Sequence, residues 1–202
     1  PSTSNATTST TAPRASFFYA SPHVWPLESS STTFATPQDA ARSFAVDYLG
    51  MTNGRVGEAT TVDSPPGLPA MTVDVFPNAR STARTAVSVV QSGPTGWVVI
   101  GANADEIVVD DPRPGGAIES PLSVSGRGTA FEGQLGLEVR SVGSANVVAT
   151  GTAMTGSNGE IGPFSTTIDP PATDQPLVLI VFEADASGGG TYTKATVMLL
   201  GT

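Results

Sequence analysis

Short runs of apolar and β-branched residues fill the sequence from Ala117 to Leu200, and turns containing Gly, Pro, Asn and Asp separate them. No helical period is present in this half. Seven such runs within about 85 residues are typical of a sandwich of two antiparallel sheets. The runs are 122–125, 129–131, 135–142, 146–152, 164–168, 177–182 and 192–200.

Two of these runs alternate between the core and the other face. Leu135, Leu137 and Val139 occupy every second position, and the segment from Phe164 to Ile168 follows the same rule. The run Leu177–Phe182 is apolar throughout, which predicts a central strand. This run is also far shorter than the roughly 18 residues of a membrane-spanning helix. We therefore predict an all-β, immunoglobulin-like sandwich over residues 117–202.

One amphipathic helix is predicted near residue 40. Thr36 is a good N-cap, Pro37 suits the first helical position, and Asp39 lies near the positive helix end. Apolar residues then recur at steps of three and four, and the glycine at position 50 suits the left-handed residue that closes a helix. The helix is expected over about 37–49. Its apolar positions are Ala41, Phe44, Ala45 and Tyr48.

Strands are predicted after this helix, because the period changes to two beyond Gly54. Met71, Val73 and Val75 alternate with polar residues, and 83–91 and 97–102 are two further strands joined by a hairpin loop at 92–96. Ile107–Val109 is expected as a short final strand. One helix on a small antiparallel sheet, an α+β domain over residues 16–110, is the economical arrangement.

The segment from Asp110 to Gly116 holds two prolines and two glycines and no apolar residue, so residues 111–116 are predicted to link two domains. Residues 1–15, rich in Ser and Thr, are predicted to form a disordered tether. The chain starts at Pro1 without a signal sequence, as expected of a mature product whose targeting segment lay upstream. Aromatic residues at 17–19 and 24–27 suit an extended segment packed across a domain face, although an exposed binding patch is the alternative.

The charge balance argues against nucleic acid as a partner. Acidic residues outnumber basic ones by 18 to 9, the net charge is −9, and the eight arginines and single lysine, Lys194, are scattered. The chain has no cysteine, so disulfides and thiolate metal sites are excluded. Cysteine-free secreted sandwiches are ordinary in bacteria, which favours a bacterial envelope as the source.

No residue set predicts catalysis. The only histidine, His23, has no acid near it in sequence, and the Gly-x-Ser-x-Gly motif is absent. Asp105, Glu106, Asp110 and Asp111 lack the spacing of a calcium loop, so a solvated hinge is the better interpretation. Gly188–Gly190 suits a flexible hairpin end. We expect no catalytic residue, no cofactor and no metal.

A series of motifs in the C-terminal half resembles the immunoglobulin-like domain of bacterial spore germination, over residues 117–200. The motifs are Ile118–Pro121, Val124–Gly126, Ala130–Gly133 and Gly162–Phe164, followed by a strand that closes near Leu200. The segment Ser187–Thr191 departs from the family, so nothing is carried over there.

This resemblance implies structural roles. It implies that Pro121 starts a strand, Gly126 permits a bend and Phe131 points into the core, while Glu132 reaches water or accepts backbone hydrogen bonds. The N-terminal half, by Thr36–Pro37, Tyr48–Gly50 and Gly96–Val99, resembles the domain that precedes this sandwich in actinobacterial lipoproteins.

The resemblance also implies an extracytoplasmic protein of the cell envelope, often a lipoprotein, without catalytic residues. We expect a binding or scaffolding module that recognises another envelope protein or a cell-wall component and meets the membrane only through an upstream anchor. The alternative is a carrier of small ligands, with an apolar pocket lined by Phe44, Tyr48 and Trp97. An enzyme with an unfamiliar pair of acids is the third hypothesis.

Overall fold

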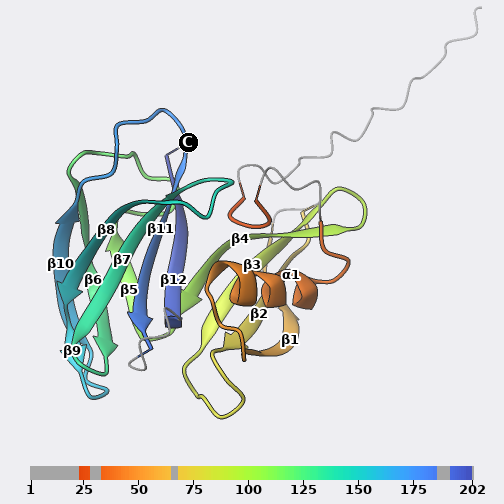
Figure 1. The fold of residues 1–202 in the computed structure, drawn as a ribbon. Helices are drawn as coiled ribbons and strands as arrows, with labels where there is room; N and C mark the ends of the chain where they lie inside the picture. The colour runs from red at the N-terminus through yellow and green to blue at the C-terminus, as the bar shows by residue number, and fades with distance from the viewer. Residues whose placement is uncertain (1–22, 28–32, 65–67, 186–191, 202) are drawn as a thin grey trace, which may run out of the picture.

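The computed structural model describes residues 23–27, 33–64, 68–185 and 192–201. Figure 1 shows two facing sheets on one side of the molecule and a single helix packed on a further sheet on the other side. The fold is therefore mostly antiparallel sheet, with one short helical segment in the described part of the chain.

The helical segment begins at the predicted cap. The Asp39 N–H donates to Thr36 Oγ1 at 3.1 Å, and α1 covers Pro37–Ser43. The segment then widens into a π-helical turn, η1, over Phe44–Tyr48. Gly50, with φ of 71°, ends the segment as predicted. The expected extent of 37–49 is confirmed, whereas the change to π geometry was not predicted.

The N-terminal sheet consists of four antiparallel strands in the order β1-β2-β3-β4. The strands are β1 (Arg55–Thr61), β2 (Ala70–Phe76), β3 (Thr85–Ser92) and β4 (Gly96–Ala104). The predicted hairpin loop after Ser92 is confirmed. Strand β1 was not predicted, because its sequence contains glycine, glutamate and threonines and its pairing with β2 is interrupted between Val56 and Ala59.

The entry segment packs alongside β4. Val24 is buried, and its N–H donates to the Val99 carbonyl at 2.8 Å, while Trp25 forms an isolated bridge with Val99. The packed alternative is therefore confirmed for residues 24–27. The aromatic residues 17–19 lie outside the described residues.

The C-terminal sheets face each other as a sandwich. One layer has the order β8-β7-β11-β12, and the other places β6 between β5 and β10, with the short β9 beside it. The strands are β5 (Ile107–Asp111), β6 (Leu122–Ala130), β7 (Gln134–Ser141), β8 (Val147–Met154), β9 (Gly156–Ser157), β10 (Gly162–Ile168), β11 (Leu177–Ala184) and β12 (Tyr192–Leu200).

The expected runs 122–125 and 129–131 belong to one strand, β6. It continues through Gly126 and Gly128 because both residues pair with β5 on one side and β10 on the other. A Cβ at Gly126 would overlap the Val108 carbonyl and the Phe164 ring. Gly126 therefore permits close packing inside a continuous strand, and the expected bend is absent. Pro121 directly precedes β6, as expected.

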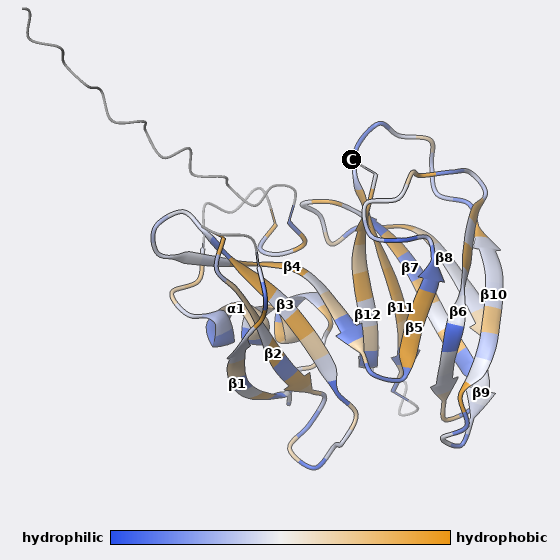
Figure 2. Cartoon of the chain, turned by 180° about the vertical axis from the view of Figure 1, so that it is seen from behind, coloured by the Kyte–Doolittle hydropathy of each residue, from blue (hydrophilic) through white to orange (hydrophobic). Residues whose placement is uncertain are grey.

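Strand β11 is central and is buried on both faces. Leu177, Leu179 and Val181 belong to the sandwich core, whereas Val178 and Ile180 belong to the core beneath the helix. This double burial accounts for the continuous apolar run, because neither face of the strand meets water. Figure 2 shows hydrophobic residues along β3, β5, β11 and β12.

Strand β5 pairs with the sandwich. It was expected to close the N-terminal sheet, but Ile107, Val108 and Val109 pair with β6, and Ile107 lies in the sandwich core. A turn at residues 105–106 joins β5 to β4, and β4 pairs with β12 at Val197↔Ala102, which joins the N-terminal strands to the sandwich. Independent folding of the two halves stays a prediction.

Candidate functional site

The predicted pocket residues pack together in the core beneath the helix. Phe44 and Tyr48 are buried, and their stacked rings lie 5.3 Å apart between centroids. Trp97 is half-buried on β4, where it bridges to Phe34. None of these three residues lines the cavities described below. The ligand-carrier alternative stays a prediction.

Arg140 forms a polar joint between the helix and the sandwich. It is buried on β7, donates from Nη1 to the Tyr48 carbonyl at 3.1 Å and from Nη2 to the Tyr192 hydroxyl at 2.8 Å, and pairs with Glu138. Its guanidinium also lies 4.6 Å from the centre of the Tyr48 ring.

The two tyrosines of this joint stay neutral over the physiological range. Burial raises the pKa of Tyr48 to about 12, and burial also raises the pKa of Tyr192. Arg140 bonds to the helical segment, to β12 and to its own strand, so the joint fastens the helix to the sheet.

The acids near residue 105 are mostly paired with cations. Asp105 pairs with Arg84, Glu106 with Lys194, and Asp110 with Arg127 at 3.5 Å. Within the described ranges, no group of three or more His, Cys, Asp or Glu side chains is placed to hold a metal ion. These acids therefore form ion pairs with cations on or next to neighbouring strands.

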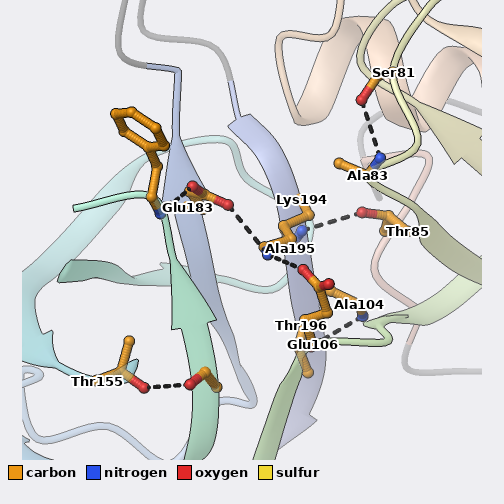
Figure 3. Close-up of polar contacts among 12 residues, drawn as sticks. Ser81, Ala83, Thr85, Ala104, Glu106, Thr155, Glu183, Lys194, Ala195 and Thr196 are labelled. Carbon is orange, nitrogen blue, oxygen red and sulfur yellow. Dashed lines mark hydrogen bonds and ion pairs between the residues drawn. The ribbon is translucent and has the colours of Figure 1, made fainter. Parts of the chain in front are cut away.

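Lys194 joins the two halves at a polar seam (Figure 3). Its side chain is 6% exposed and bridges Glu106, in the turn between β4 and β5, and Glu183 of β11, which lies 3.2 Å away. Nearby, the Ala195 N–H donates to Thr85 Oγ1 at 3.1 Å and the Ala104 N–H to Thr196 Oγ1 at 3.1 Å. A cavity of about 150 Å³ lies beside Lys194, lined mostly by these paired charges.

The surface most open to a partner is one end of the sandwich, which we call the loop end. It comprises residues 105–106, 131–133, 154–161 and 183–185. Strand pairing brings them together, because Met154 lies opposite Gln134, Gly162 opposite Gly128, and Phe182 opposite Gly136. All these pairs lie at the ends of their strands.

Exposed apolar side chains gather at this end. In the described part of the chain, five large apolar side chains are exposed, and three belong to the loop end. These are Phe131 at 70%, Met154 at 69% and Ile161 at 60% exposure. Val62 and Val147 lie elsewhere. Apolar groups concentrated on one end of a soluble domain are typical of an interaction surface.

A cavity of about 350 Å³ opens beside Phe131. Phe131 and Phe182 supply its aromatic lining, and Glu132, Glu183 and Asp185 supply three carboxylates. Gly136 lies in its wall, where a Cβ would overlap the Phe182 ring. Phe182 stacks on Tyr192 with ring centroids 4.1 Å apart. Tyr192 therefore holds the Phe182 ring of this wall in place.

The turn that carries Phe131 is held by its backbone. The Phe131 N–H donates to Glu183 Oε1 at 2.7 Å, and Glu183 is itself paired with Lys194. Gly133, with φ of 69°, closes the turn by donating from its N–H to the Ala130 carbonyl at 3.0 Å. The phenyl group is therefore presented from a fixed backbone.

The expectation that Phe131 points into the core is wrong. Ala130 and Leu135, on either side of the turn, fill the core at this end, and the chain crosses from one sheet to the other between them. Phe131 lies on the crossing and faces outward. Glu132 is exposed, which matches one of its two expected environments.

Sequence reasoning missed the loop end as a site. The available signal was apolar residues placed directly against turn residues, as with Met154 before Thr155–Gly156 and Ile161 before Gly162. These residues cannot all lie in the middle of a strand. Which of them remain uncovered depends on the strand register, and the sequence alone does not fix the register.

No helix within the described ranges is both long enough and apolar enough to cross a membrane.

Comparison with known families assigns the C-terminal region. Residues 106–190 match the family model described as the immunoglobulin-like domain of bacterial spore germination. This confirms the resemblance, with bounds of 106–190 in place of 117–200, so the match includes β5 and ends before β12. No curated protein and no solved structure gives a significant match to the chain.

Proposed function

We propose that this chain, whose residues 106–190 carry the immunoglobulin-like domain of bacterial spore germination, is a non-enzymatic binding or scaffolding protein of the bacterial cell envelope. Its partner is another envelope protein or a cell-wall component. The loop end of the sandwich is the docking surface, and the N-terminal half serves to cover the outer face of β11 and β12 away from that end.

The observation that carries this proposal is the exposure of Phe131. A phenyl group that is 70% exposed beside a cavity forgoes the burial that large apolar groups normally gain, so a further function explains its position. Aromatic residues are also enriched among the residues that dominate binding energy at protein interfaces. Met154 and Ile161 are also exposed at the loop end.

The absence of catalysis is supported by the residues near the cavity. An immunoglobulin-like domain typically supplies loops for recognition and no reactive group. The carboxylate of Glu183 is largely buried, but it accepts from the Phe131 N–H and pairs with Lys194, so it is not the unpaired acid that catalysis would use. The net charge of −9 disfavours nucleic acid as the partner.

An extracytoplasmic location is part of the proposal. It rests on the family of the C-terminal region, on the cysteine-free composition and on the resemblance of the N-terminal half to actinobacterial lipoproteins. A lipid anchor upstream of the described residues would then hold the protein at the outer face of the membrane. Fractionation of source cells, with and without globomycin treatment to block lipoprotein processing, tests this part.

Site-specific photo-crosslinking in the source cells tests the docking surface. The photoreactive residue p-benzoylphenylalanine replaces Phe131 in one variant and Val147 in a matched control. Val147 is 45% exposed and lies at the opposite end of β8 from Met154, so it samples the same sheet away from the loop end. We expect a discrete crosslinked species at position 131 and none at 147.

Equal crosslinking at both positions, or crosslinking at 147 alone, would contradict the placement of the docking surface. A crosslinked peptide identified by mass spectrometry at position 131 would give the partner directly. If a small ligand is recovered with the protein and no macromolecule is crosslinked, the ligand-carrier alternative would be favoured.

A further inference from the structure

We propose that the cavity beside Phe131 receives an arginine side chain, so that the partner at the loop end is a basic protein segment. This inference rests on the proposed function, since it names the chemistry that the docking surface recognises. It is carried by the lining of the cavity, by its size and by two matching contacts elsewhere in the chain.

The lining carries only negative formal charge. Glu132, Glu183 and Asp185 contribute carboxylates, and no Lys, Arg or His is among the described residues that line the cavity. Lys194 offsets part of the charge of Glu183 from behind, while Glu132 is exposed to solvent. A concave site lined by carboxylates concentrates cations and repels anions, in a chain whose net charge is −9.

The aromatic part of the lining selects among cations. A planar guanidinium stacks on an aromatic face and forms paired hydrogen bonds with a carboxylate, whereas an ammonium group does neither as well. Phe131 supplies the exposed ring, and Glu132 is its neighbour in the chain. Arginine is therefore favoured over lysine.

Two arginine side chains of this protein already lie against aromatic rings. The guanidinium of Arg55 lies 3.6 Å from the centre of the Phe76 ring, and that of Arg140 lies 4.6 Å from the centre of the Tyr48 ring. Phe131 is an exposed aromatic group of the same kind at the entrance of a cavity. Phe131 therefore offers an aromatic ring to the guanidinium of an arginine in the partner.

The cavity is large enough for one long side chain. Its volume of about 350 Å³ lies near the lower end of the range for small-ligand pockets. The residues that flank the arginine in the partner would then rest on the apolar surface beside the cavity. Met154 supplies part of that surface, because it lies opposite Gln134, which lines the cavity.

A titration followed by ¹H–¹⁵N NMR tests the inference with the intact protein. The probe is the blocked tripeptide acetyl-Gly-Arg-Gly-amide, and the matching Lys, Leu and Glu tripeptides are controls. We expect the arginine peptide to shift the amide signals of Phe131, Glu132 and Glu183 saturably, with at least tenfold tighter binding than the leucine peptide. The lysine peptide should bind more weakly than the arginine peptide, and the glutamate peptide should not bind.

Two variants separate specific recognition from general attraction to an acidic surface. Glu132→Gln should weaken binding of the arginine peptide several-fold, because it removes the exposed carboxylate of the lining. Glu160→Gln is the control, since Glu160 is an exposed acid at the same end that does not line the cavity. Equal effects of both variants would overturn the assignment to this cavity.

The other outcomes are equally decisive. Leucine binding as tight as arginine binding would overturn the cationic class and leave the loop end as an apolar docking surface. No binding of any tripeptide would overturn the inference about the cavity, while crosslinking at position 131 would still support the proposed function. Loss of crosslinking at 131 together with arginine binding would overturn the proposed function and leave the cavity as an arginine site.

Discussion

Two aromatic surfaces of the sandwich differ in how they are covered. On the outer face of β11 and β12, Tyr192 is buried beside Val178 and Ile180, and the helix, the π-helical turn and Arg140 cover it. At the loop end, Phe131 stands on a fixed turn and nothing in the described chain covers it. The first surface is satisfied within the molecule, whereas the second is left open.

The difference separates apolar groups that are buried in the fold from those that we propose contact a partner. Val178 and Ile180 sit on a strand whose outer face would be apolar and exposed in an isolated sandwich, and the N-terminal half removes that exposure. The loop end receives no such cover. If this distinction is right, mutations on the two surfaces should separate stability from binding.

The largest effect is expected on the covered surface. Ile180→Ala removes a fully buried side chain beneath the helix and should lower the free energy of unfolding by about 4 kcal/mol. Val147→Ala, on an exposed position, should change it by less than about 0.5 kcal/mol. Urea denaturation followed by tryptophan fluorescence measures both, and equal losses would show that the outer face is not a core.

The joint at Arg140 should come next. Arg140→Met leaves the Tyr48 carbonyl, the Tyr192 hydroxyl and the largely buried Glu138 without this partner, and should cost about 3 kcal/mol. The double variant Arg140→Met with Glu138→Leu should recover part of the loss, because it also removes the lone carboxylate. No recovery in the double variant would mean that Arg140 acts through packing alone.

Alkaline pH should loosen the same joint. The pKa of Tyr48 is raised to about 12 by burial, so the folded state favours the neutral tyrosine. The stabilisation this provides is complete below the ordinary tyrosine pKa near 10 and is lost as pH rises towards 12, by about 2 to 3 kcal/mol.

Urea unfolding midpoints measured at pH 9 and pH 11.5 test whether the stability falls as the pH rises. In Tyr48→Phe the decline should be smaller, and the variant should be near neutral in stability at pH 7, since the buried Tyr48 hydroxyl has no hydrogen-bond partner among the described residues. A wild-type protein whose stability is flat up to pH 12 would contradict the burial of this joint.

The seam at Lys194 should contribute less. Lys194→Met leaves Glu183 without its cation and should cost about 1 to 2 kcal/mol, because one partner is largely buried and the other is half-exposed. Glu106→Gln should cost less than about 1 kcal/mol and lose its effect at high salt. A larger loss for Glu106→Gln than for Lys194→Met would place the important ion pair on the exposed side.

Local patterns predicted most of the elements but not how they come together. Thr36, Pro37 and Gly50 fixed the helix ends by capping chemistry, and the continuous run at 177–182 indicated the central strand. The placement of β5 was wrong because an apolar run of three residues is equally suited to either sheet. The partner strand, far along the chain, decides that choice.

The candidate site was the least predictable part. Phe131 carries the signature of a core residue in the family motif, and only the crossing between sheets turns it outward. Phe44 and Tyr48 were predicted as pocket residues from their aromatic side chains, and that prediction stays open, although the two rings stack on each other beneath the helix. Exposure of an aromatic group depends on its neighbours in space, which sequence periodicity does not give.

The most direct test of the account compares Phe131→Ala with Ile180→Ala in two measurements, the free energy of unfolding and the yield of the species crosslinked through p-benzoylphenylalanine at position 154. Position 154 lies at the same end as Phe131, so it reports docking in both variants. We predict that Phe131→Ala keeps the unfolding free energy within about 0.5 kcal/mol and loses most of the crosslink. Ile180→Ala should lose stability and keep the crosslink. A Phe131→Ala protein that is strongly destabilised, or that crosslinks as well as the parent, would contradict the claim that the loop end is kept open for a partner.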